Sequence, residues 1–181
     1  MAEHRIILFR GMNIGGVRAP VAEQRAMAAE MGLGNPRTLV ASGNLVVESD
    51  APTTDLEGAV EQAMEARFGL KIAAMVRTPE QWRALMKANP FPDEAEADPS
   101  RLLMMVMKDG IAEGAVEALR GFAVDGEKVE AAGGALWLWH PEGIGQSKMA
   151  DKAQPRLTGM GTARNWNTVG KLAEMTETGD R

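Results

Sequence analysis

The stretch RTLVASGNLVVE, residues 37–48, decides the fold class. Two apolar runs with β-branched residues, Arg37–Ala41 and Leu45–Glu48, flank the short link Ser42-Gly43-Asn44. Gly and Asn tolerate the backbone conformations of a tight turn, so the pattern predicts a β-hairpin. The segments on either side of this hairpin then determine the fold to which it belongs.

Those flanking segments alternate between strand and helix patterns. A short strand is predicted at Arg5–Phe9, followed by a helix that starts at Pro20 and ends near Gly32. Beyond the hairpin, apolar residues at helical spacing over 56–68 predict a second helix, and Lys71–Arg77 predicts a fourth strand. The order βαββαβ is that of the ferredoxin-like unit, also called the α/β plait, with four antiparallel strands and two helices on one face.

The second half of the chain repeats this order. A continuous apolar strand, Leu102–Met107, precedes a helical stripe over 111–122. Two further strands, Glu127–Ala131 and Ala135–His140, flank Gly133-Gly134 and predict a second hairpin. The remaining predicted elements are a helix over Lys148–Leu157, a short strand over Thr162–Arg164 and a last helix over Thr168–Glu177. We therefore expect an α+β protein with two ferredoxin-like units in tandem.

Two helix starts carry the capping-box spacing, in which a Ser or Thr precedes a Glu or Gln by three residues. The first pair is Thr54 with Glu57, and the second is Thr78 with Gln81. The second pair predicts a helix that runs through Lys87.

The acidic run Pro92–Asp98 is predicted to be a linker, because Pro and charged residues punctuate it and no apolar period crosses it. The expected organisation is unit 1 over residues 1–78, a connecting helix and linker over 79–99, and unit 2 over 100–181.

Composition narrows the classes of function. The 181 residues are 45% apolar and 25% charged, which is typical of a soluble globular protein. There is no cysteine, so disulfides, thiolate metal sites and cysteine nucleophiles are excluded. No residue spacing predicts a metal site or a cofactor. The absence of a signal-peptide pattern and of a long apolar run predicts a cytoplasmic protein without a membrane partner.

Polar side chains gather in four loops rich in Gly or Asn. Arginine holds carboxylate or phosphate groups, and Asn offers both a donor and an acceptor to orient a ligand. The candidate ligand-binding residues are Arg10, Asn13, Ser42, Asn44, Ser147, Lys148, Arg164, Asn165 and Asn167. Each loop also has a purely structural interpretation: glycines permit turns, Ser147 can cap the following helix, and Asn167 can cap the last one.

No catalytic set stands out, and whether the protein is an enzyme stays open. His140 ends a strand opposite a Gly-rich loop, where it is a candidate acid or base, although a single His at a strand end is more often packed. Ser147 and Lys148 are adjacent, which on a helix directs them about 100° apart and argues against a Ser–Lys dyad.

Five motifs, in this order and at this spacing, are similar to those of one bacterial family, domain of unknown function 1697. They are Leu8–Gly16, Ser42–Val46, Asn89–Phe91, Gly143–Lys148 and Ala163–Thr168. The resemblance runs from about residue 4 to residue 175, and it implies two ferredoxin-like units but no established activity, substrate or cofactor.

This sequence departs from the family pattern at two positions. Met12 stands where an aliphatic residue is usual, and Gln146 where a basic residue is common. The second departure removes a charge from a loop that is a candidate anion site.

Three functions follow as hypotheses. The first is a cytoplasmic protein that binds a small anionic ligand in a cleft between the two units, anchored by Arg10 and Arg164, with Trp166 as a stacking wall. The second is a nucleic-acid-binding protein that stacks bases on Trp137 and Trp139, which the net charge of −5 disfavours. The third is a protein–protein or homodimeric (homo-oligomeric) interaction module.

Overall fold

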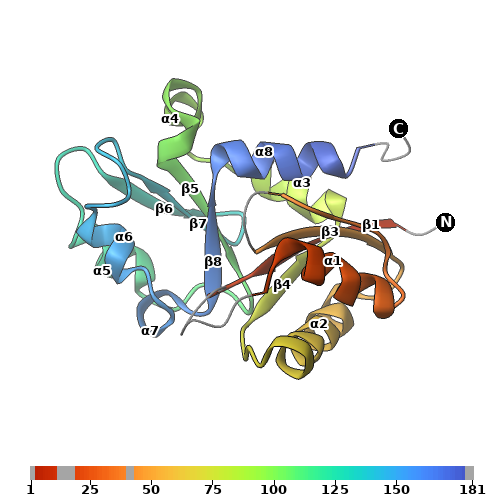
Figure 1. Ribbon diagram of the computed structural model, residues 1–181. Coiled ribbons are helices and arrows are strands. Elements are labelled where there is room, and N and C mark those ends of the chain that lie inside the picture. The colour runs from red at the N-terminus through yellow and green to blue at the C-terminus, as the bar shows by residue number, and fades with distance from the viewer. Residues whose placement is uncertain (1–2, 12–18, 40–42, 178–181) are drawn as a thin grey trace. The chain divides into compact units, whose positions relative to one another are not determined.

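The computed structural model describes residues 3–11, 19–39 and 43–177 (Figure 1). The chain divides into two compact units, of which unit 1 comprises Met1–Trp82 and Leu172–Arg181, and unit 2 comprises Arg83–Lys171. Each unit holds one four-stranded sheet. The division differs from the predicted one, because the predicted linker groups with unit 2 and the last ten residues group with unit 1.

Unit 1 has the predicted order βαββαβ. Its elements are β1 (Glu3–Phe9), α1 (Val21–Glu30), β2 (Gly34–Thr38), β3 (Asn44–Ser49), α2 (Thr53–Phe68) and β4 (Ala74–Arg77). The strand order is β2-β3-β1-β4, and every neighbouring pair is antiparallel. This is the ferredoxin-like topology expected from the sequence. Helix α3 (Pro79–Lys87) follows and leads into unit 2.

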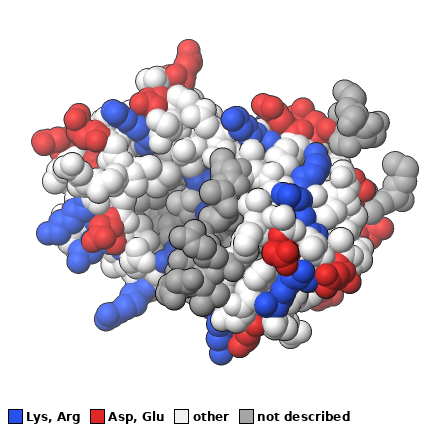
Figure 2. Space-filling view, in the orientation of Figure 1, with Lys and Arg blue, Asp and Glu red and all other residues white. Residues whose placement is uncertain are grey.

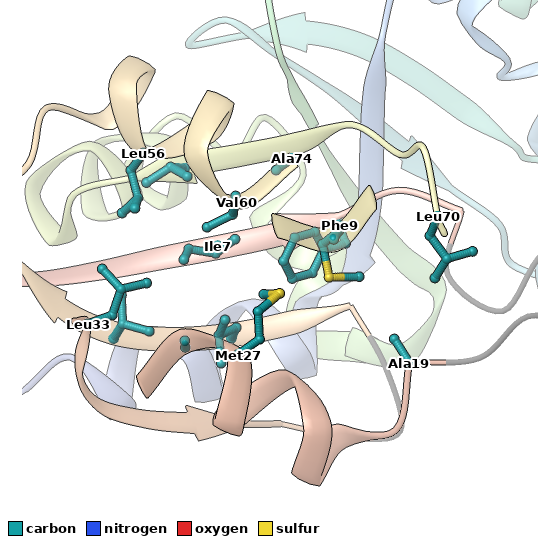
Figure 3. Packing of buried hydrophobic residues seen from close by; sticks show 14 residues of the cluster. Ile7, Phe9, Ala19, Met27, Leu33, Leu56, Val60, Leu70 and Ala74 are labelled. Carbon is teal, nitrogen blue, oxygen red and sulfur yellow. The ribbon is translucent and has the colours of Figure 1, made fainter. Parts of the chain in front are cut away.

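The core of unit 1 lies between the sheet and helices α1 and α2. Alternation along β1 directs Ile7 and Phe9 toward these helices, where they join Met27 of α1 and Val60 of α2 (Figure 3). Ile6, on the other face of β1, is also fully buried. The second half of the inner strand β1, Ile6–Phe9, is therefore apolar on both faces, which explains its continuous apolar run.

Two details of unit 1 differ from the prediction. Strand β2 begins at Gly34 and contains Pro36, which a strand tolerates here because β2 is at the edge of the sheet and its register shifts between Gly34 and Arg37. The capping box of Thr54 and Glu57 does not form. Glu57 instead accepts the Val76 N–H at 2.9 Å.

The capping box at the start of α3 is confirmed. The Thr78 hydroxyl accepts the Gln81 N–H at 3.1 Å, and the Gln81 side chain accepts the Thr78 N–H at 2.9 Å. These two bonds satisfy two of the otherwise orphaned amides of the first turn.

Unit 2 repeats the topology of unit 1. Its elements are α4 (Pro92–Ala97), a 3-10 turn (Pro99–Arg101), β5 (Leu102–Met107), α5 (Ala115–Arg120), β6 (Lys128–Ala132), β7 (Ala135–Trp139), α6 (Lys148–Lys152), α7 (Pro155–Thr158) and β8 (Gly161–Asn165). The strand order is β6-β7-β5-β8, again antiparallel throughout. Helix α8 (Trp166–Met175) then leads back into unit 1.

Three predicted segments of unit 2 take a different form. The acidic linker is helix α4, which buries Ala95. The helix predicted over 148–157 is two short helices, since Pro155 cannot continue the first and starts the second. Helix α5 covers only the middle of the predicted stripe. None of the described helices combines the length and apolarity that a membrane span requires.

Candidate functional site

In unit 1, the structure brings the ends of three strands together near two of the predicted loops. The Phe9 N–H donates to the Gly43 carbonyl at 3.0 Å, and the Arg10 N–H donates to the Ala73 carbonyl at 3.0 Å. Arg10 therefore lies where β1 ends, next to the starts of β3 and β4. The candidates Asn13 and Ser42 lie outside the described residues.

Asn44 serves the hairpin of unit 1. It is only 2% exposed, and its side-chain amide donates to the Leu39 carbonyl at 3.1 Å. Its own carbonyl accepts the Leu39 N–H at 3.2 Å. These bonds close the link between β2 and β3, and they account for a buried Asn at this position without a ligand.

In unit 2, a buried polar network joins His140, Glu127 and Ser147. The Nδ1 atom of His140 lies 3.2 Å from the Glu127 carboxylate, and the Ser147 hydroxyl helps to lower the pKa of the same carboxylate. Ser147 also accepts the Ala150 N–H at 3.0 Å and so caps α6, as predicted. The network ties the hairpin of β6 and β7 to the loop that follows it.

Burial controls the charge of this network. It lowers the pKa of His140, although the neighbouring Glu127 acts in the opposite direction. Burial alone would raise the pKa of Glu127, but hydrogen bonds from Ser147, the Val124 N–H and His140 hold that pKa below its usual value. The stable arrangement near neutral pH is therefore a neutral imidazole beside a carboxylate.

The geometry does not support a role for His140 in catalysis. The residue is 0% exposed, and its Nε2 atom is buried with no hydrogen-bond partner in the part of the chain that the structure describes. The Ser147 hydroxyl is engaged in the cap of α6. The three residues resemble a catalytic triad in type, but their bonds fix a loop.

Glu127 is not among the candidate site residues predicted from the sequence, although the register of the hairpin places it next to His140. The pairing of Lys128 with Trp139 across the Gly133-Gly134 turn places the preceding residue, Glu127, opposite the following residue, His140. The position of the turn sets the register of the two strands, and this register alone predicts that the carboxylate of Glu127 lies opposite His140 at the open end of the hairpin.

Arg164 is a partly buried cation of unit 2. Ala163 packs into the core beneath the helices, so alternation along β8 places Arg164 on the other face of the sheet. Its Nη1 donates to the Thr162 hydroxyl at 2.7 Å and to the Ala163 carbonyl at 2.8 Å. Burial lowers the pKa of Arg164 to about 10, so the guanidinium still carries its charge at neutral pH.

The other candidates of unit 2 differ in their exposure. Lys148, at the start of α6, and Asn167, in the first turn of α8, are exposed. Asn165 accepts the Thr168 N–H at 3.0 Å, so Asn165 caps α8 and the cap predicted for Asn167 is wrong. The helix begins two residues earlier than predicted because the capping residue also ends strand β8.

The aromatic face proposed for base stacking is not exposed at Trp137. This residue is 0% exposed, its indole N–H donates to the Ala132 carbonyl at 3.1 Å, and its ring lies 5.8 Å from that of Trp166. On the face drawn in Figure 2, the described Lys and Arg side chains are interspersed with Asp and Glu and form no broad basic surface. Both observations remove support from the nucleic-acid hypothesis.

Two predictions about the site stay predictions. Five of the nine candidates belong to unit 2 and four to unit 1. Because each unit is described by itself, the predicted cleft is not tested, and neither is the homodimer. Within the described ranges, no three His, Asp or Glu side chains gather closely enough to hold a metal ion.

Comparisons with known proteins identify relatives without an assigned role. The family model described as "Protein of unknown function (DUF1697)" matches residues 2–137. Among solved structures, the chain is similar to the conserved bacterial protein SP0830 from Streptococcus pneumoniae, with 17% sequence identity, coverage of 98% of this chain and 100% of that chain, and a TM-score of 0.78. At that identity the likeness shows the fold alone. No curated protein matches the chain.

Proposed function

The chain belongs to the DUF1697 family of proteins of unknown function, and from that premise we propose that it binds a small anionic ligand through Arg164. The single observation that carries the proposal is a charged, partly buried guanidinium on β8, on the sheet face opposite the helices, whose pKa desolvation lowers to about 10. A carboxylate or a phosphate is the anion that a planar guanidinium recognises best, because it can accept two parallel hydrogen bonds.

Desolvation penalises the charge of Arg164. Two of its acceptors, the Thr162 hydroxyl and the Ala163 carbonyl, are neutral oxygens, and an anion would add an opposite charge in a medium of low dielectric constant. An ion pair formed there is screened less by salt than one on the surface. The same desolvation lowers the stability of the folded state, which argues against a role for Arg164 in packing alone.

The supporting side chains are fewer than the sequence suggested. Ser147, Asn165 and Asn44 have their side-chain oxygens or amides engaged in caps and turns. Of the predicted set in unit 2, Lys148 and Asn167 are exposed and remain available to a ligand. Their participation and that of Arg10 belong to the proposal and are tested separately.

The experiment is a thermal-shift and calorimetric titration with phosphate, small mono- and dicarboxylates and short single-stranded RNA. Arg164→Met is compared with Arg156→Met, which removes an equal charge from an exposed position in the same unit. A ligand at 100 times its dissociation constant adds about 2.7 kcal/mol of stability, which raises the midpoint of a protein of this size by several degrees.

We expect at least one small anion to stabilise the wild type and Arg156→Met equally, and to leave Arg164→Met unshifted. Arg10→Ala is titrated in parallel, and a loss of affinity there assigns Arg10 to the same ligand. A response to oligonucleotides alone, or an anion shift that persists in Arg164→Met, contradicts the proposal.

A further inference from the structure

A second candidate site in unit 2 uses none of the nine residues selected from the sequence. A pocket of about 320 Å³ is lined by residues from the end of α3, from helix α4, from the start of α8 and from the segment between α3 and α4. Trp166 of α8, Met86 of α3 and Ala95 of α4 form its apolar wall. This volume is at the lower end of the range of pockets that hold small molecules.

The polar lining of this pocket combines opposite charges. Lys87 at the end of α3 and Glu96 of α4 both line it and are both exposed. In the part of the chain that the structure describes, no ion pair involves either residue. Glu94, on the same helix, differs in that it is paired with Lys128 at 2.5 Å. A cation and an anion that do not pair with each other favour a ligand that carries both charges.

Asn89 adds directional donors. Its side-chain oxygen accepts the Phe91 N–H at 2.8 Å, which fixes the orientation of the amide. Within the described residues no hydrogen bond uses its NH₂ group, which is a possible donor in a pocket that Lys87 also lines. Together they suit a carboxylate, while the Glu96 carboxylate suits an ammonium group.

The size of the pocket limits the ligand. A water molecule occupies about 30 Å³ in the liquid, so the pocket holds roughly ten of them, or a molecule of roughly ten to fifteen non-hydrogen atoms. An amino acid with one aromatic ring has this size, and its ring matches the wall formed by Trp166. A nucleotide is larger than this volume.

We infer that this pocket binds an aromatic α-amino acid as the zwitterion. Lys87 and Asn89 hold its carboxylate, Glu96 holds its ammonium group, and Trp166 stacks on its ring. The inference does not depend on the anion site at Arg164, because it rests on other side chains and on a ligand with no net charge.

The test is an NMR titration with L-phenylalanine, monitored on the four indole N–H signals. Trp166→Phe identifies the signal of Trp166 by its loss. We expect saturable binding that shifts this signal. The two analogues that lack one charge, 3-phenylpropanoate and 2-phenylethylamine, should bind about tenfold more weakly, since each loses a charge-assisted contact.

Variants at exposed positions keep the test independent of folding. Lys87→Met and Glu96→Gln should each weaken L-phenylalanine binding about tenfold, whereas Lys171→Met and Glu113→Gln, which change the same charges away from the pocket, should not. The inference is overturned if L-phenylalanine does not saturate, if either analogue binds as tightly, or if the two pocket variants bind like their controls.

Discussion

At the scale of single residues, His140 has the clearest consequence for stability. Its folded-state pKa lies below that of the unfolded chain, about 6.5, so between these two values the unfolded state binds more protons. Stability should therefore decrease as the pH falls below about 6.5. Glu127, whose folded pKa is also lowered, acts in the same direction, starting near pH 4.3 and below.

The variant His140→Gln should remove the first of these two effects. The measurement is urea unfolding of both proteins between pH 5 and 8, which gives the slope of the free energy of unfolding with pH. A general loss of stability in the variant shifts the whole curve and leaves the slope interpretable. An unchanged slope between pH 5 and 6.5 would show that His140 does not cause the acid sensitivity.

The pair Asn165 and Asn167 separates a structural role from a ligand role. Asn165→Ala removes the cap of α8 and should cost about 1 kcal/mol of stability, while Asn167→Ala, an exposed position in the first turn, should stay within about 0.5 kcal/mol of the wild type. Chemical denaturation of both variants gives the comparison. Equal losses, or a larger loss for Asn167→Ala, would refute the assignment of the cap.

These residues also show what the sequence could and could not predict about the candidate site. The pattern correctly identified polar side chains at loops, and it predicted the cap formed by Ser147. It could not tell that the amide of Asn44 is turned inward to Leu39, because Asn at a turn looks the same whether it faces a ligand or its own backbone. The solvent exposure of the Asn side chain distinguishes an amide that is open to a ligand from one that bonds the backbone. This exposure depends on tertiary packing, which the local sequence does not show.

At the scale of elements, two capping boxes with the same spacing had different outcomes. Thr78 and Gln81 form both bonds, whereas α2 begins at Thr53 after Pro52 and makes no side-chain cap. The reason is competition for Glu57: the Val76 N–H and Arg77 use its carboxylate to tie α2 to β4. The spacing of Thr54 and Glu57 indicates only that a local hydrogen bond is possible. The contact of Glu57 with β4 determines which hydrogen bonds its carboxylate makes.

These two threonines therefore make a matched pair for measurement. Thr78→Ala should lower the free energy of unfolding by about 1 kcal/mol, because it leaves the Gln81 N–H without its acceptor. Thr54→Ala should change it by less than about 0.5 kcal/mol, since Thr54 is exposed and caps nothing. Guanidinium unfolding of the two variants tests the difference, and similar values would contradict it.

At the scale of the whole molecule, the order of elements predicted both units, but it did not predict which residues each unit comprises. The periodicity of apolar residues that indicates a strand or a helix is a local property of the sequence. The repeated βαββαβ order could therefore be predicted in each half of the chain. The assignment of Leu172–Arg181 to unit 1 depends on contacts that are far apart in sequence. One of them is the hydrogen bond that the Arg37 guanidinium donates to the Met175 carbonyl at 2.7 Å. No local sequence pattern predicts this bond.

This division predicts that the end of α8 stabilises unit 1. Leu172 is fully buried, so Leu172→Ala should cost about 2–5 kcal/mol, and Leu119→Ala, at an equally buried position in unit 2, should cost a similar amount. Hydrogen exchange distinguishes the two, because protection is lost first in the unit that a substitution weakens. We expect Leu172→Ala to accelerate exchange in β1–β4 and Leu119→Ala to accelerate it in β5–β8. If Leu172→Ala instead accelerated exchange in β5–β8 and spared β1–β4, or if both variants affected the two sheets alike, the end of α8 would not belong to unit 1 in energetic terms.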